Sequence, residues 1–371
     1  MIRILIADDS VIVRAMLGQV LGDDSRFDIV GMAENGKHAV DMDSEFLPDM
    51  IVMDVNMPIM NGIEATKLIK ANRNPAIVAF TTEDAAEVGY KCIEAGAIDI
   101  VQKPNLATMN MEQIKNFCDK LAVMSENFKR HNTPSDSLKK KYYYAKTLTD
   151  DMTGTLEDGS NTDKFEPKKF SVLAIGASTG GPIAIQKVLN GLCRHSNFPL
   201  PIIITQHIDE MFDRQFSQWL STTTSFPVKT AETGDILEKA HVYVAPAGKH
   251  LCIERKTDGS LGIVLDDSEP VHFLKPAVDK MFCSCAEVVG SKTLAVILTG
   301  MGNDGTDGLK EIKFHGGYTI AESEKTSVIF GMPKSAIDAG AISRVEDLEE
   351  IPQFIFKLTS CGIDFFTKDD K

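Results

Sequence analysis

Carboxylates gather at the ends of two short apolar segments near the start of the chain. Asp8 and Asp9 directly follow Ile2–Ala7, and Asp54 directly follows Met50–Met53. In an open parallel sheet both segments would end at the same edge, so the three carboxylates would share one small region. Like charges held this close either raise a carboxyl pKa or bind a hard divalent cation through oxygen ligands. We therefore expect a carboxylate site with metal-binding capacity at this edge.

A cation and a hydroxyl are expected beside these carboxylates. Lys103 follows the apolar run Ile98–Val101, and either Thr81 or Thr82 supplies a hydroxyl after Ala76–Phe80. A single strand-end aspartate is more simply explained as a cap for the helix that follows it. The combination of carboxylates, hydroxyl and lysine at successive strand ends is what favours a chemical site.

A serine in a run of small residues forms a second chemical candidate. Ser178 lies in the sequence Gly-Ala-Ser-Thr-Gly-Gly-Pro, between the apolar run Ser171–Ile175 and a predicted helix. Small neighbours allow a sharp turn that exposes the hydroxyl at a helix N-terminus, where backbone N–H groups favour negative charge. The spacing matches a nucleophile elbow. A nucleotide-binding loop is the alternative, but the glycine spacing differs and no lysine follows.

A base and a carboxylate follow two later apolar runs. His207 follows Pro201–Thr205, and Asp304 lies in a glycine-rich turn after Leu294–Leu298. A strand-end histidine can reach a serine across one sheet edge, and a carboxylate can orient it. Taken singly, a helix cap, a packed histidine and a turn former are the simpler interpretations. The chain order Ser, His, Asp also differs from that of α/β-hydrolases.

The spacing of the apolar runs predicts two α/β domains joined by a linker. Residues 1–128 alternate five short apolar runs with segments of helical period, as expected for five βα units around a parallel sheet. Residues 129–169 lose this periodicity and predict a flexible linker. Its basic and aromatic run Lys139–Tyr144 is interpreted as a solvated or interdomain-docking segment. Strand-like runs return in a second α/β domain, residues 170–360.

The composition limits the classes of function. The 371 residues carry 39 basic and 53 acidic side chains, a net charge of −14 that disfavours nucleic-acid binding. An odd count of seven cysteines indicates reduced thiols rather than a disulfide framework. The first residues do not resemble a signal peptide, and no apolar run approaches the ~20 residues of a membrane helix. We expect a cytoplasmic protein without direct membrane insertion.

The motifs Asp-Asp, Asp-x-x-x-Pro, Thr and Lys-Pro stand at successive predicted strand ends. With these motifs, the first ~125 residues resemble the receiver domain of bacterial response regulators. The resemblance implies a flavodoxin-like (βα)5 fold and transfer of a phosphoryl group from a histidine kinase to Asp54. It further implies Mg²⁺ binding by Asp9 and Asp54, with Asp8 acting through water, and Lys103 and Thr81 as switch residues.

The second half of the chain resembles the catalytic domain of the protein-glutamate methylesterases of bacterial chemotaxis. The resemblance implies a doubly wound, mainly parallel α/β esterase domain. Lys275, Ala277 and Ala247 stand where this family more often has Arg, Ser and Gly, which affects substrate loops rather than the triad. The matching stretches are Gly176–Pro182, Gln206-His207, Tyr243–Pro246, Lys275–Asp279, Thr299–Gly305 and Thr326–Pro333.

These resemblances imply a phosphorylation-activated serine esterase that hydrolyses glutamate methyl esters on methyl-accepting chemotaxis receptors. Deamidation of receptor glutamines is a second reaction open to the same site. Ser178 is the expected nucleophile, His207 the base and Asp304 its partner, with the Met301 N–H as oxyanion donor, aided by Thr179. No cofactor is expected in the esterase site. The alternatives are a response regulator whose second domain only binds a partner, and, less favoured, a DNA-binding output.

Overall fold

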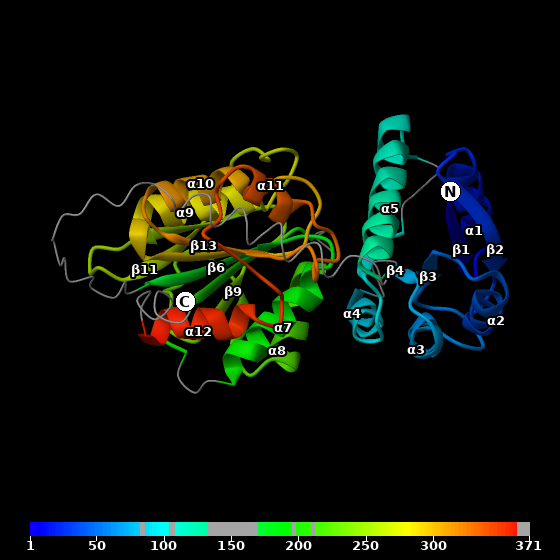
Figure 1. The fold of residues 1–371 in the computed structure, drawn as a ribbon, viewed down its shortest axis with the longest axis horizontal. Helices are drawn as coiled ribbons and strands as arrows, with labels where there is room; N and C mark the ends of the chain where they lie inside the picture. The colour runs from blue at the N-terminus through cyan, green and yellow to red at the C-terminus, as the bar shows by residue number, and fades with distance from the viewer. Residues whose placement is uncertain (82–85, 104–107, 133–169, 195–197, 209–211, 362–371) are drawn as a thin grey trace, which may run out of the picture.

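The computed structural model contains two α/β domains, and the α/β fold class predicted from the sequence is confirmed (Figure 1). It describes residues 1–81, 86–103, 108–132, 170–194, 198–208 and 212–361. Most of the predicted linker, including Lys139–Tyr144, lies outside the described residues, and its first four residues continue a helix. No helix in the described ranges has the combined length and apolar character needed to span a membrane.

The N-terminal domain is a five-stranded parallel sheet in the order β2-β1-β3-β4-β5. Its order agrees with the predicted (βα)5 fold, and it brings the ends of β1 and β3 side by side. The elements are β1 (Ile2–Ala7), α1 (Val11–Gly22), β2 (Phe27–Ala33), α2 (Gly36–Phe46), β3 (Met50–Asp54), α3 (Gly62–Asn72), β4 (Ala76–Thr81), α4 (Ala86–Glu94), β5 (Asp99–Gln102) and α5 (Met111–Asn132).

Local sequence explains most of these boundaries. Ser10, Asn35 and Asn61 cap the N-termini of α1, α2 and α3 by accepting a backbone N–H from the first turn. Every residue of β3 is buried, as expected for a central strand covered on both faces. Helix α5 runs to Asn132, four residues past the predicted domain boundary at residue 128, and no Gly or Pro intervenes in those four residues.

The C-terminal domain is built on a seven-stranded parallel sheet in the order β14-β13-β12-β6-β7-β9-β8. Its strands are β6 (Val172–Ala177), β7 (Ile202–Gln206), β8 (Val228–Thr230), β9 (Val242–Val244), β12 (Thr293–Ile297), β13 (Tyr318–Glu322) and β14 (Arg344–Glu346). Its helices are α7 (Gly181–Cys193), α8 (Asp213–Thr223), α9 (Val278–Val289), η3 (Gly290–Lys292), α10 (Thr306–Phe314), α11 (Met332–Asp338) and α12 (Ile351–Cys361).

Two strands lie apart from this sheet. β11 (Leu261–Asp266) pairs antiparallel with β10 (His250–Arg255) in a separate two-stranded sheet. Leu251 and Ile253 of β10 and Ile263 of β11 are buried in the same apolar cluster as residues of α9, so the hairpin packs one face on the core.

Helices cover both faces of the seven-stranded sheet (Figure 1). α7, α8 and α12 lie on one face and α9, α10 and α11 on the other, with a separate apolar cluster under each layer. From β6 the chain forms β7, then the edge strand β8, then β9 between them, and it later crosses to β12 on the other side of β6. Strand order therefore reverses between β6 and β12, and the crevice beyond the carboxyl ends of these strands is where ligands bind in such sheets.

The two domains touch through α4 of the receiver and α8 of the C-terminal domain. Tyr90 of α4 is almost fully buried, and its hydroxyl donates to the Phe212 carbonyl at 3.3 Å. The Tyr90 ring stacks against Phe216 and Trp219, with centroid distances of 5.9 and 5.3 Å. In Figure 1, α4 and α5 are the receiver helices on the side that faces the C-terminal domain. An aromatic contact thus joins the two domains.

Candidate active site and phosphoacceptor site

Ser178 occupies a sharp turn between β6 and α7. Its backbone N–H donates to the Thr299 carbonyl at 3.0 Å, and its own carbonyl accepts the Gly181 N–H at 2.8 Å. Gly180 completes the turn with φ of 77°, and a Cβ there would lie 2.6 Å from the Val328 Cβ. Only glycine meets both demands. The turn presents the serine at the N-terminus of α7, where helix amides favour a developing negative charge.

The strand pairing brings His207 next to Ser178. Ala177 of β6 is the register partner of Gln206 of β7, so the serine and the histidine each follow a paired residue. The His207 N–H donates to the Ala177 carbonyl at 3.1 Å. The Gln206 side-chain amide donates to the carbonyls of Ser178 and His207, at 2.8 and 3.0 Å. Gln206 therefore ties the two strand ends together.

Asp304 is buried and holds the histidine ring. Its Oδ2 lies 2.7 Å from His207 Nε2 and also accepts the Val278 N–H at 2.7 Å, while Oδ1 accepts the Asp279 N–H at 2.9 Å. Burial alone would raise the pKa of Asp304, but the hydrogen bond from His207, its charge and the two amides of α9 hold that pKa below its usual value. An ionised Asp304 can accept only from a protonated Nε2, and in the neutral imidazole this tautomer leaves Nδ1 with a free lone pair.

Ser178 and His207 line one cavity of about 650 Å³, together with Thr179 and Met301. Receiver residues, among them Lys120, line the same cavity. Within the described ranges no hydrogen bond joins the Ser178 hydroxyl to the His207 ring, a contact that often tightens only when substrate binds. The cavity therefore brings together the predicted nucleophile, base and oxyanion residues, with the receiver covering part of its wall.

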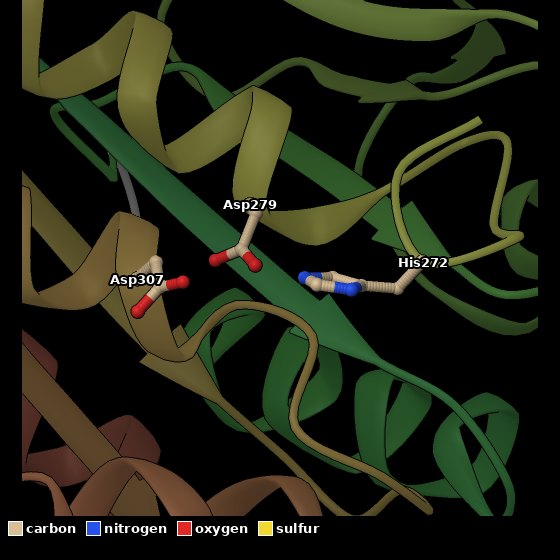
Figure 2. A group of neighbouring side chains, drawn as sticks. All are labelled: His272, Asp279 and Asp307. Atoms are coloured by element: carbon tan, nitrogen blue, oxygen red, sulfur yellow. The ribbon is translucent and has the colours of Figure 1, made fainter. Parts of the chain in front are cut away.

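A further group of side chains surrounds the start of α9 and α10. Figure 2 shows His272 from a loop and Asp279 and Asp307 from the first turns of these helices, pointing toward one another. Their ligand-type atoms lie within 4.8 Å of one another. Asp279 also accepts the Gly308 N–H at 2.7 Å. The favourable position of carboxylates in a first helical turn accounts for both aspartates, and we assign this group no ligand.

The predicted carboxylate site of the receiver is assembled at the ends of β1, β3 and β5. Oxygens of Asp8, Asp9 and Asp54 lie within 4.8 Å of one another. Lys103 Nζ lies 2.8 Å from Asp8 Oδ2 and 2.7 Å from Asp54 Oδ2. Thr81 is buried at the end of β4, and its carbonyl accepts the Lys103 N–H, whereas Thr82 lies outside the described residues.

These residues fit a bound divalent cation. Burial raises the pKa of Asp54 to about 6, against the opposing effect of Lys103 and with a contribution from the charge of Asp8. One lysine offers one positive charge to three carboxylates, so excess negative charge remains at the site. Oxygen donors of this kind suit Mg²⁺. Asp9, which is exposed, is the most accessible of the three.

Comparisons with known proteins agree with this geometry. Residues 4–115 match the family described as "Response regulator receiver domain", and residues 173–355 match "CheB methylesterase". A Methanococcus maripaludis protein named protein-glutamate methylesterase/protein-glutamine glutaminase is 33% identical over 361 residues, which cover 96% of this chain and 97% of that protein. The chain belongs to the protein-glutamate methylesterase family. The resemblance predicted from the sequence is thereby confirmed.

Other methylesterases of this family match over a similar length. The Thermotoga maritima member is 34% identical, and the match covers 96% of this chain and 98% of that protein. The solved catalytic domain of Thermotoga maritima CheB methylesterase is 39% identical and covers 51% of this chain and 99% of its own length, with a TM-score of 0.49. Membership in the methylesterase family favours an enzyme over a binding module or a DNA-binding output.

Sequence reasoning did not assign roles to several residues that shape this methylesterase site. Gln206 appeared only as a neighbour of His207, although its side chain ties two strand ends. The amides of Val278 and Asp279 hold Asp304 from a helix that begins 26 residues earlier in the chain. Strand-end position was the available signal for Gln206. For the α9 amides the sequence carries no signal, because backbone groups are the same at every position.

Proposed function

We propose that this chain is a phosphorylation-activated serine esterase that hydrolyses glutamate methyl esters on methyl-accepting chemotaxis receptors. Family membership supports the reaction, and one observation supports the residues that carry it. The His207–Asp304 hydrogen bond lies at the strand-end crevice that also presents Ser178. The proposed catalytic residues are thus Ser178, His207 and Asp304.

In the first half of the reaction Ser178 attacks the ester carbonyl. His207 Nδ1 takes the serine proton as the oxygen–carbon bond forms, and then returns it to the methoxide, which leaves as methanol. Asp304 stabilises the imidazolium through Nε2. The Met301 N–H, with Thr179 beside it, is the proposed donor to the oxyanion. The product of this half is a glutamyl ester of Ser178.

Water completes the reaction by the same route. His207 takes a proton from the attacking water, the glutamate carboxylate is released, and the proton returns to the Ser178 oxygen. A glutamine side chain presents a carbonyl of similar shape, and its amide nitrogen can leave as ammonia through the same steps. We therefore include deamidation of receptor glutamines in the proposal.

The receiver domain supplies the control. We propose that Asp54 accepts a phosphoryl group from a chemotaxis histidine kinase and that Lys103, already 2.7 Å from Asp54, pairs with the phosphorylated side chain. Asp8, Asp9 and Asp54 are the residues that would hold Mg²⁺. The ion, when bound, offsets negative charge during phosphoryl transfer.

Contacts between the domains support control by access to the esterase site. The receiver residues Asn116, Asp119 and Lys120 line the cavity that contains Ser178. Tyr90, on α4, is buried against aromatic residues of α8. We propose that the unphosphorylated receiver favours this covered arrangement and that phosphorylation of Asp54 shifts the population toward an open one.

The assignment of Ser178 is tested by covalent labelling. A fluorophosphonate reacts with an activated serine, which displaces fluoride and forms a stable phosphonyl ester that mass spectrometry locates. We expect labelling of Ser178 in parallel with loss of methanol release, and no labelling in His207→Ala. Labelling of a different serine, with Ser178 unmodified and activity lost, would show that the nucleophile has been assigned wrongly.

A further inference from the structure

Glu322 is a fully buried acid that the proposed mechanism does not use. It ends β13, next to β12, and none of its surface is exposed. Its Oε2 accepts the Thr299 N–H at 2.8 Å. Its Oε1 is buried and has no hydrogen-bond partner within the described part of the chain. A carboxylate in this setting would carry an unpaired charge, which is far more costly than a neutral acid.

Thr299 connects Glu322 to the proposed catalytic residues. Its carbonyl accepts the Ser178 N–H at 3.0 Å, and its hydroxyl donates to the Thr179 carbonyl at 2.9 Å. The same hydroxyl accepts the Ile329 N–H at 2.8 Å. Met301, the proposed oxyanion donor, follows two residues later. One residue thus contacts the nucleophile turn on one side and Glu322 on the other.

We infer that Glu322 is a positioning residue whose neutral form holds the turn Thr299–Met301 in the geometry required for catalysis. The inference rests on the proposed function, because it concerns the same oxyanion donor. Ionisation would leave charge on Oε1 in an apolar interior, and the acid would regain hydration only by displacing the turn. Loss of the turn geometry would misplace the Met301 N–H and reduce the rate.

The surroundings of Glu322 favour the neutral form near neutral pH. Burial raises the pKa of Glu322 to about 7, despite the Thr299 N–H and the nearby Thr326 hydroxyl, which favour the charged form. Glu349 raises this pKa and Lys187 lowers it, and these two side chains pair with each other at 3.1 Å.

The facing strand offers no free cation to Glu322. Glu346 of β14 is its register partner, and Arg344 Nε already lies 2.7 Å from Glu346 Oε1. An acid whose pKa is raised by folding stabilises the fold most at low pH, and the contribution is lost as pH rises through the folded value. Both activity and stability should therefore fall as Glu322 ionises.

The test compares the full-length wild type with Glu322→Gln, which keeps the acceptor for Thr299 and cannot ionise. The measured quantity is the ratio of the variant's methanol-release rate to the wild-type rate, in which titrations common to both cancel. We expect this ratio to rise about tenfold between about pH 6 and about pH 8. Over this range the neutral fraction of Glu322 in the wild type falls about tenfold if its pKa is about 7, whereas the variant does not titrate at this position. Glu254→Gln, at an exposed acid of β10 in the separate two-stranded sheet, is the control and should give a flat ratio.

A ratio for Glu322→Gln that stays constant across this range would overturn the inference. Should the variant fail to fold, the Thr299 amide resonance of wild-type protein gives an independent reading. It should shift with a midpoint near the pKa of Glu322, and an amide that does not titrate would also overturn the inference. Failure of the proposed function is distinct, because methanol release by Ser178→Ala at about pH 6 would reveal it whatever the ratio.

Discussion

The Trp219 indole N–H donates to the Glu94 carboxylate at 2.9 Å, across the boundary between esterase and receiver. The same indole stacks against Tyr90 with a centroid distance of 5.3 Å. Both receiver residues lie on α4, and Trp219 lies on α8. One side chain of the catalytic domain is therefore held by two residues of the regulatory helix, and changes in this contact should alter access to the esterase cavity.

Replacement of Glu94 by alanine should activate the unphosphorylated enzyme. Loss of the hydrogen bond to Trp219 costs the covered arrangement about 1 kcal/mol, which corresponds to a rise of about fivefold in basal methanol release when that arrangement dominates. Lys91→Ala, an exposed position on the same helix, is the matched control and should leave the basal rate unchanged. An equal rate in Glu94→Ala and wild type would argue against control through this contact.

Trp219 also provides an optical measurement of the same transition. It is the only tryptophan in the 371 residues, and it is mostly buried in the contact with α4. Addition of a small phosphodonor with Mg²⁺ should expose the indole and shift its emission to longer wavelength. Asp54→Asn should show no shift. An unchanged spectrum in a sample shown to be phosphorylated would indicate that this contact persists in the active state.

Asp304→Asn should retain the fold of the site and lose most of the activity. The asparagine oxygen can still accept an amide of α9, but it cannot hold His207 in the tautomer that leaves Nδ1 free. We expect the rate to fall by about 10³–10⁴-fold, as for loss of the carboxylate in other triads. Asp307→Asn, three residues later and exposed, is the control. A decrease below about tenfold would exclude Asp304 as the triad carboxylate.

Removal of divalent cations should affect regulation and leave the esterase chemistry intact. With excess chelator, the increase in methanol release caused by a phosphodonor should disappear, because Asp8, Asp9 and Asp54 retain uncompensated negative charge. The basal rate should be unchanged, since the proposed mechanism uses Ser178 with a histidine base and no metal ion. A basal rate that falls with chelation and recovers with added Mg²⁺ would place a cation requirement in the esterase step.

Sequence reasoning predicted the strands that carry continuous apolar runs and missed those that do not. β1 begins and ends as predicted, because it is a continuous apolar run that ends at Asp8 and Asp9. β14 is the three-residue segment Arg344–Glu346, whose polar composition gives no strand signal before its partner β13 is known. Whether such a short segment forms a strand depends on its pairing with a neighbouring strand in the folded protein.

The proposed functional residues also differ in how far the sequence predicts their positions. Ser178, His207 and Asp54 lie at the ends of apolar strands, so their common sheet edges could be predicted from parallel topology. The contact between Asp304 and the α9 amides depends on how a distant helix is placed on the sheet. Glu322 could not be recognised either, because an acidic residue at a strand end is usually exposed, whereas here it is fully buried.

The central claim is tested most directly by methanol release from methylated receptor membranes, measured with and without a small phosphodonor. The wild-type rate should rise when the phosphodonor is added, Asp54→Asn should keep the basal rate under both conditions, and Ser178→Ala should release no methanol under either. Turnover by Ser178→Ala at the wild-type rate would contradict the account.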